Sequence, residues 1–277
     1  MKGHFLMNTL QNLHTHTTYC DGRDTPEEMI LHALDKGFGS VGFSGHSYMY
    51  FAPTHSMSVE GTADYKREVL ALKEKYKGII DVFLGLELEY YSEVETEGYE
   101  YMIGSLHYLD IEGEKVGFDR SAEVVRKVID TYFGGDGLAI AKQYYRNVIE
   151  LPDKCSLDIL GHFDLITKNL ELATLFDADS REYRNAAFEA IEALSGRIPY
   201  FEVNTGAIAR GYRSTPYPSA EITRELLRRG FGAVISSDCH DGRMLDCNFE
   251  QARELLASCG CRERYVLTDE GFVPVAL

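Results

Sequence analysis

Long apolar segments are missing from this sequence: no run of about 18 consecutive apolar residues occurs, which argues against a transmembrane helix. The first dozen residues also lack the apolar stretch and the small-residue cleavage site of a secretion signal. We therefore expect a cytoplasmic protein with no membrane partner.

Cysteine pairs are missing as well, because none of the six cysteines forms a C-x-x-C motif with another. Such spacing indicates neither a zinc ribbon nor a disulfide framework, and we expect reduced thiols. The cysteines are Cys20, Cys155, Cys239, Cys247, Cys259 and Cys261.

Positive charge is scarce, with 28 Lys and Arg against 44 Asp and Glu and a formal net charge of −16. No Lys/Arg-rich run concentrates the positive charge that a phosphate backbone would need, so we expect no extended nucleic acid as a partner. Residues 85–101 are strongly acidic, which is typical of a solvated face. Glu87 is the one carboxylate of this segment that we consider as a ligand.

The length of 277 residues and the hydrophobic content of 44% suit one domain with a substantial core, residues 1–277. Short β-rich runs alternate with helical patterns, which predicts an α/β fold of βα units around a parallel sheet, closed as a distorted barrel. Seven strands are expected at residues 10–14, 40–44, 82–86, 102–106, 157–161, 200–204 and 233–237. Helices are expected at residues 26–36, 63–76, 122–132, 138–149, 181–194, 220–229 and 249–258.

Residues that commonly bind metals follow the ends of six of these seven strands. In a parallel barrel all such ends lie on one rim, where barrel enzymes carry their chemistry. A single buried histidine is more often a packed core residue than a ligand, but joint placement at six strand ends is hard to obtain by chance. The residues are His14, His16, His46, Glu87, His107, His162, Asp238 and His240.

Two of these sites have an i, i+2 spacing, which places both side chains of an extended segment on one face. His14 and His16 can therefore bind one ion while Thr15 faces away. In residues 238–240 the same spacing directs Cys239 out of the site, unless the backbone bends and makes Cys239 a ligand. Asp21 lies in a short loop after the histidine pair and is either a turn residue or a further ligand.

Mixed imidazole and carboxylate groups suit zinc, iron or manganese. Because a catalytic zinc ion takes three or four protein ligands, this set indicates two or three metal ions. Three histidines lie outside the set. His4 and His32 are expected to be surface or packing residues, whereas His55 could reach over the rim as a substrate contact.

The motifs at residues 14–16, 43–46, 85–87, 104–107, 161–162 and 237–240 resemble those of the polymerase and histidinol phosphatase (PHP) superfamily. Their order and spacing match over almost the whole chain and look like the stand-alone histidinol-phosphate phosphatase branch. The resemblance implies a distorted (β/α)7 barrel with a trinuclear metal centre, in agreement with the seven units counted above.

The same resemblance implies how the ligands are shared. One metal would take His14, His16, Glu87 and Asp238. A second would share Glu87 and add His107 and His162, and a third would take Asp21, His46 and His240. The family often has Ala where Cys239 stands here, which matters little if that side chain faces away.

The implied reaction is phosphate monoester hydrolysis, with L-histidinol phosphate as the expected substrate. A water bridging two metals would lose a proton near neutral pH and attack phosphorus, and Asp238 or another metal-held water would protonate the leaving group. Glu87, Asp238 and His240 are the expected catalytic residues. Arg210 is the first choice for phosphate binding, with Arg213 as the alternative.

For the cationic and imidazole end of this substrate, two loops offer binding groups whose other interpretation is ordinary packing. They are Tyr48, Tyr50, Phe51, Glu89, Tyr90 and Tyr91. Two other functions stay open: a PHP phosphoesterase acting on a nucleotide or short oligonucleotide, and a non-catalytic metal-binding structural module. The oligomeric state is also open.

Overall fold

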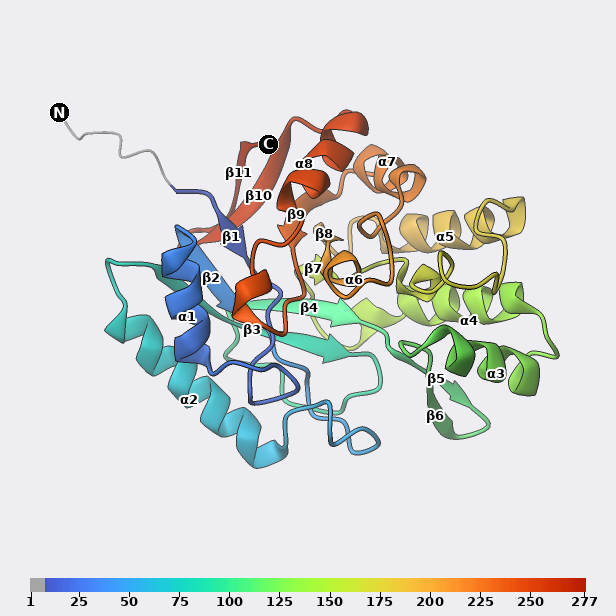
Figure 1. Ribbon diagram of the computed structural model, residues 1–277, viewed down its shortest axis with the longest axis horizontal. Helices are drawn as coiled ribbons and strands as arrows, with labels where there is room; N and C mark the ends of the chain where they lie inside the picture. Colours follow the sequence, from blue (N-terminus) through green and yellow to red (C-terminus); the bar gives the residue numbers. More distant parts are fainter. Residues whose placement is uncertain (1–7) are drawn as a thin grey trace.

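Seven parallel strands form the centre of the computed structural model, which describes residues 8–277 (Figure 1). His4 lies outside the described residues. The strand order is β1-β2-β3-β4-β7-β8-β9, and each neighbouring pair is parallel. The strands are β1 (Gln11–Asn12), β2 (Ser40–Phe43), β3 (Asp81–Glu89), β4 (Tyr101–Ser105), β7 (Ile159–Leu160), β8 (Tyr200–Asn204) and β9 (Gly232–Ser236). The predicted seven-stranded α/β fold is confirmed.

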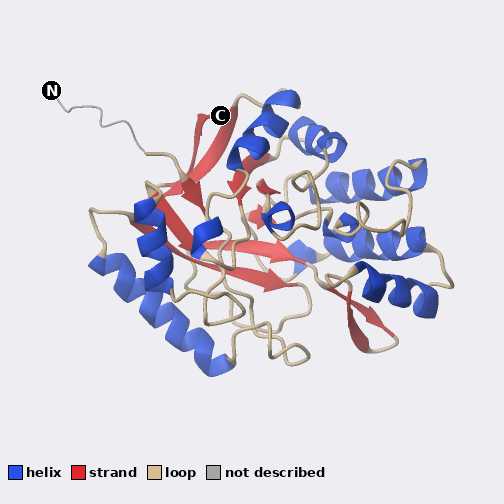
Figure 2. Ribbon diagram, viewed as in Figure 1, coloured by secondary structure: helices blue, strands red, loops and turns tan. Residues whose placement is uncertain are grey.

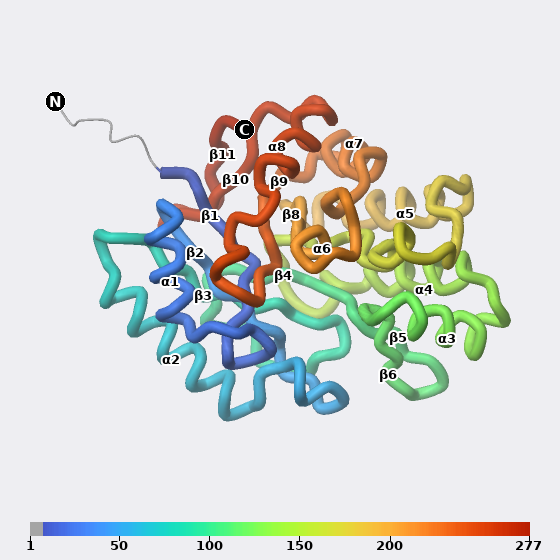
Figure 3. The backbone as a smooth tube through the Cα atoms, viewed as in Figure 1, coloured from blue at the N-terminus to red at the C-terminus, as the bar shows by residue number. Residues whose placement is uncertain are grey.

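The sheet closes into a barrel just beyond the ends of β1 and β9. There Thr15 and Cys239 form an isolated parallel bridge. The His16 amide donates to the Cys239 carbonyl at 2.9 Å, and the Cys239 amide donates to the His14 carbonyl at 3.2 Å. The tube in Figure 3 shows the early segment around β1 beside the late segment around β9. Closure therefore occurs at the segments that carry predicted ligands.

Helices cover the outside of this sheet (Figure 2). They are α1 (Pro26–Asp35), α2 (Val59–Lys75), α3 (Ala122–Tyr132), α4 (Gly137–Ile149), α5 (Arg181–Leu194), α6 (Gly206–Ala209), α7 (Ala220–Arg228) and α8 (Phe249–Ser258). Short 3-10 turns occur at η1 (Leu151–Asp153), η2 (Leu165–Thr167) and η3 (Gly242–Met244). Within the described residues no helix is both long and apolar enough to cross a membrane.

Local capping explains where the helices begin. Thr25 and Glu28 form the capping box expected at the start of α1, with Pro26 as its first residue. Helix α2 begins four residues before the predicted start, because the Ser58 side chain accepts from the Gly61 amide at 2.9 Å and caps it there.

Two antiparallel hairpins were not predicted. One, β5 (Tyr108–Ile111) and β6 (Glu114–Gly117), follows β4, and the other, β10 (Glu263–Thr268) and β11 (Gly271–Ala276), ends the chain. Positive φ angles at Glu112 and Gly113 form the tight turn of the first hairpin. The second lies against β9 and exchanges hydrogen bonds with Gln11, so it covers the barrel end opposite the predicted site.

Buried apolar residues form two layers, one between barrel and helices and one inside the barrel. Tyr101 fills the interior, and its hydroxyl donates to the Leu13 carbonyl. A Cβ atom at Gly42 or Gly85 would lie within 2.4 Å or 2.2 Å of the Tyr101 side chain, so only glycine fits at these positions. The packed interior supports the rim from below.

Candidate metal centre

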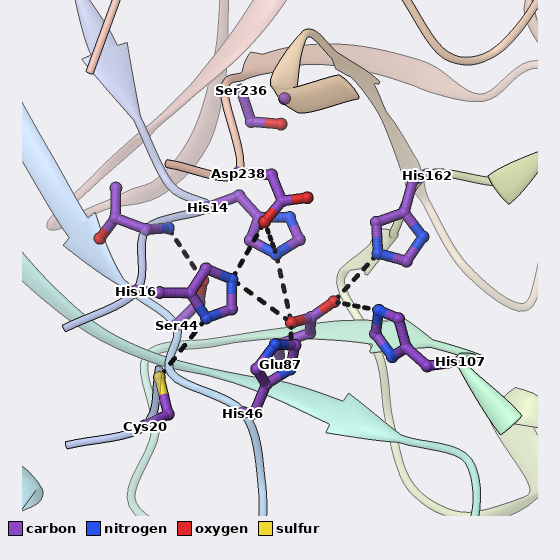
Figure 4. Close-up of polar contacts among 12 residues, drawn as sticks. His14, His16, Cys20, Ser44, His46, Glu87, His107, His162, Ser236 and Asp238 are labelled. Carbon is purple, nitrogen blue, oxygen red and sulfur yellow. Dashed lines mark hydrogen bonds and ion pairs between the residues drawn. The ribbon is translucent and has the colours of Figure 1, made fainter. Parts of the chain in front are cut away.

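All nine predicted ligands lie in one group at the carboxyl ends of the barrel strands. Figure 4 shows the ligands that it labels pointing toward one another from β3 and from the segments after β1, β2, β4, β7 and β9: His14, His16, His46, Glu87, His107, His162 and Asp238. Asp21 and His240 extend this group on the side of His16 and His46. The structure therefore brings together every predicted ligand, including Asp21.

Glu87 lies at the middle of the group, and its two oxygens face different histidines. Its Oε1 is 3.1 Å from His162 Nε2 and 3.5 Å from His107 Nε2. Its Oε2 is 2.8–3.5 Å from ring nitrogens of three histidines: His46, His14 and His16. Glu87 lies inside β3 rather than after it, because β3 continues to Glu89 and beyond the predicted end.

A third set of donors surrounds Asp21. Its Oδ1 lies 3.4 Å from His240 Nε2, 3.8 Å from His46 Nε2 and 3.7 Å from His16 Nδ1. Asp21 is still part of a turn, but its carboxylate faces the histidines.

The i, i+2 geometry predicted for both ligand pairs is present. Thr15 faces away, since its hydroxyl donates to the Gly42 carbonyl at 2.8 Å. Cys239 also faces away, with its sulfur 3.9 Å from the sulfur of Met29, which argues against Cys239 as a ligand. Asp238 has φ of 47°, in the left-handed region that residues with a side chain adopt uncommonly and that recurs at functional sites.

Two buried carboxylates behind the ligands were missed as supporting groups. Glu202 on β8 accepts from His14 Nδ1 at 2.8 Å and from the His162 amide at 2.7 Å. Glu89 accepts from His107 Nδ1 at 2.9 Å. Such bonds fix which ring nitrogen is free to bind a metal. The available signal was an acidic residue inside an otherwise apolar strand, and for Glu89 the i, i+2 spacing from Glu87.

Glu89 was considered as a binding group for the cationic end of the substrate. That role is wrong, because Glu89 is 1% exposed and its carboxylate accepts from His107. The hydroxyl of Tyr90 contacts Glu150, and that of Tyr91 contacts Asn147 and the Asp110 amide. These tyrosines pack in the structure instead of facing the donors.

Charges within the group are strongly coupled. Burial and the neighbouring His240 and His46 lower the pKa of His16 to about 3. The His16 imidazole is therefore neutral and can offer a nitrogen lone pair to a metal. Burial also disfavours charge on His107, but the carboxylates of Glu87 and Glu89 outweigh it and raise the pKa of His107 to about 9. Burial alone would raise the pKa of Glu87, but the neighbouring histidines outweigh this effect and hold the pKa well below its usual range.

Several buried nitrogen and oxygen atoms of the candidate ligands have no hydrogen-bond partner among the described residues. They are Nε2 of His14 and His16, Nδ1 of His46, Oε2 of Glu87 and Oδ1 of Asp21, and each faces another potential ligand atom. Leaving buried polar atoms unpaired is costly, and a cation between them satisfies them. The mixed nitrogen and oxygen donors fit divalent metal ions.

Of the two predicted arginines, only Arg210 contacts the group. It donates to Asp238 Oδ2 at 3.0 Å and to the Asp238 carbonyl at 2.9 Å. Arg213 instead donates to Thr167 and lies 4.4 Å from the centre of the Tyr217 ring.

A cleft opens beside the donors. Its walls come from the loop after β2, from the β5-β6 hairpin and from the residues before α3. The lining residues are Asp21, His46, Met49, His55, His107, Tyr108, Gly117, Asp119 and Arg120. His55, considered as a substrate contact, lies in this cleft, whereas the exposed Tyr50 does not line it.

Comparison with known proteins agrees with this geometry. The sequence profile described as PHP domain matches residues 12–206, more than half of the chain. The chain belongs to the PHP domain family. The candidate ligand motifs from His14 to His162 lie within the matched residues, and the motif around Asp238 follows them.

Curated relatives match along most of this PHP protein. It is 29% identical over 271 residues to the "Probable histidinol-phosphatase" of Deinococcus radiodurans, covering 92% of this chain and 96% of the relative. It is 24% identical to the histidinol-phosphatase of Bacillus subtilis, covering 82% of this chain and 92% of the relative.

A solved structure shows the same fold. Histidinol phosphate phosphatase from Lactococcus lactis, crystallised with zinc, L-histidinol and phosphate, aligns with a TM-score of 0.72 at 17% identity. The alignment covers 96% of this chain and 99% of the Lactococcus protein. The (β/α)7 barrel expected from the resemblance is thus confirmed.

Proposed function

We propose that this PHP protein is a metal-dependent phosphatase that hydrolyses L-histidinol phosphate to L-histidinol and phosphate. The observation that carries the proposal is the convergence of nine nitrogen and oxygen donors beside Arg210 on one barrel rim. The names of the Deinococcus and Bacillus relatives support this substrate, as does the Lactococcus structure with L-histidinol and phosphate.

The donors would hold two to three divalent transition metal ions, zinc, manganese or iron. One ion would be bound by His14, His16, Glu87 and Asp238. A second would share Glu87 and add His107 and His162, whose Nε2 atoms both face Glu87 Oε1. The third would be bound by Asp21, His46 and His240.

When bound, these ions supply Lewis acidity, which activates water near neutral pH and neutralises charge on the phosphate. The protein supplies orientation: Glu202 and Glu89 keep the Nδ1 protons of His14 and His107, so that the Nε2 lone pairs face the centre. Arg210 offers guanidinium N–H groups to the nonbridging oxygens, where charge increases in the transition state. Asp238 lies beside Arg210 and is the candidate to carry a proton to the leaving alkoxide.

The proposal is tested by steady-state kinetics at equal metal loading on L-histidinol phosphate, p-nitrophenyl phosphate and a nucleoside 3′,5′-bisphosphate. The highest kcat/KM is expected for L-histidinol phosphate. A tenfold advantage for the bisphosphate would assign a nucleotide phosphoesterase, and a metal-loaded protein that hydrolyses none of them would assign a structural module.

A further inference from the structure

Only two carboxylates line the cleft beside the donor group within the described residues, Asp21 and Asp119. Asp21 faces the histidines and is accounted for as a metal ligand. Asp119 lies between the β5-β6 hairpin and α3 and contacts none of the proposed ligands directly.

One oxygen of Asp119 is engaged and the other is free. Oδ1 accepts from Nζ of Lys168, whose side chain is only 8% exposed. Oδ2 makes no hydrogen bond or ion pair with any described residue, and the side chain is 30% exposed. Burial opposes charge on Asp119, but Lys168, His107 and Arg210 lower its pKa, so the group is a carboxylate at neutral pH.

The proposed substrate restricts where its cation can lie. In L-histidinol phosphate the ammonium group is on the carbon next to the ester CH2, four bonds from phosphorus. At roughly 1.5 Å per bond, the nitrogen cannot be more than about 5 Å from phosphorus. A phosphate held by the metals and Arg210 therefore keeps the ammonium close to the rim, where Asp119 is the cleft carboxylate, among the described residues, that is not a proposed metal ligand.

We propose that Asp119 binds the ammonium group of an amino-alcohol phosphate and thereby selects such substrates over phosphate esters without this cation. The inference rests on the proposed function and adds a specificity-determining residue to it. The imidazole would then lie deeper in the cleft between Tyr108, Met49 and His55. Tyr108 is fixed there by Phe51, with ring centres 5.0 Å apart.

The experiment compares Asp119→Asn with the wild type on L-histidinol phosphate and on 3-(imidazol-4-yl)propyl phosphate, which replaces the ammonium by hydrogen. In the wild type, loss of the ammonium should reduce kcat/KM by about 10²-fold, as expected for a charge-assisted hydrogen bond. Asp119→Asn should reduce kcat/KM on L-histidinol phosphate by a similar factor and change the rate on the analogue less than about threefold. The two changes should thus be non-additive.

Control variants separate recognition from structure. Asp110→Asn removes a carboxylate of the β5-β6 hairpin that pairs with Lys115, as Asp119 pairs with Lys168. It should leave kcat/KM on both substrates unchanged. Asp119→Glu retains the charge and should recover part of the preference. Metal content and the thermal unfolding midpoint are measured for each variant, because Asp119→Asn leaves Lys168 without its partner.

Equal losses on both substrates, or no loss on either, would overturn the role of Asp119. Failure of the proposed function has a different signature: the wild type would then show no preference for L-histidinol phosphate over p-nitrophenyl phosphate. A wild-type preference that persists in Asp119→Asn refutes only the inference about Asp119.

Discussion

The substitution Glu202→Gln tests whether a buried carboxylate behind the ligands sets their proton positions. Both Glu202 oxygens are occupied by donors. Oε1 accepts from the His162 amide at 2.7 Å and from the Asn204 side-chain amide at 2.9 Å, whereas Oε2 accepts from His14 Nδ1 and from the Ser236 hydroxyl. The His162 and Asn204 groups can only donate, so an amide NH2 cannot replace Oε1.

The glutamine must therefore place its NH2 group toward His14, where the carboxylate oxygen had been. To avoid two facing donors, His14 must move its proton from Nδ1 to Nε2 and lose the lone pair that faces Glu87 and Asp238. Loss of such a supporting partner typically lowers metal affinity by about 10- to 100-fold. This corresponds to about 1.4–2.8 kcal/mol.

The measurement is a competition titration of each protein against a chelator, followed by elemental analysis. A matched control is Asp158→Asn, which alters a carboxylate that accepts from the Met102 amide and contacts no candidate ligand. Nitrogen chemical shifts of His14 in zinc-loaded protein report whether Nδ1 keeps its proton. Unchanged metal affinity together with a proton still on Nδ1 in Glu202→Gln would refute the reasoning.

Purified protein should retain two to three equivalents of transition metal by elemental analysis, and at most one equivalent after metal is supplied would contradict the multinuclear centre. Glu87→Gln should abolish turnover while circular dichroism shows a retained fold, because both Glu87 oxygens face histidine nitrogens; near-normal rates would exclude its bridging role. Arg210→Ala should lower kcat/KM by about 10²-fold and Arg213→Ala by less, and the reverse order would transfer phosphate binding to Arg213. Burial raises the pKa of Cys239 to about 12, so the native thiol stays protonated and should resist iodoacetamide from pH 7 to 9; rapid labelling of this cysteine in folded protein would show that it is accessible.

The order of strands and the ligand group could be predicted because both depend on local patterns. Apolar runs mark the strands, and parallel closure brings their carboxyl ends together whatever the connections do. His14 and Glu87 were therefore found from their places along the chain. Their neighbours Glu202 and Glu89 were not recognised as supports, since that role depends on a histidine partner that follows another strand.

Features that depend on the path of a connection were not predictable. The β5-β6 hairpin lies within the connection between β4 and β7, and its pairing depends on the tight turn at Glu112 and Gly113. The choice between Arg210 and Arg213 likewise depends on the turn after β8, where α6 directs Arg210 to Asp238 and leaves Arg213 on Tyr217. Asp119 is significant only because that hairpin places it in the cleft.

The bridge between Thr15 and Cys239 has a consequence for how the protein matures during synthesis. It joins the segment that carries His14 and His16 to the segment that carries Asp238 and His240, more than 220 residues later in the chain. Because a ribosome produces the chain from the N-terminus, the early histidines wait for their partners until nearly all of the barrel has emerged. The complete set of candidate ligands is therefore assembled late in biogenesis, and a nascent chain arrested before residue 238 would expose an incomplete set.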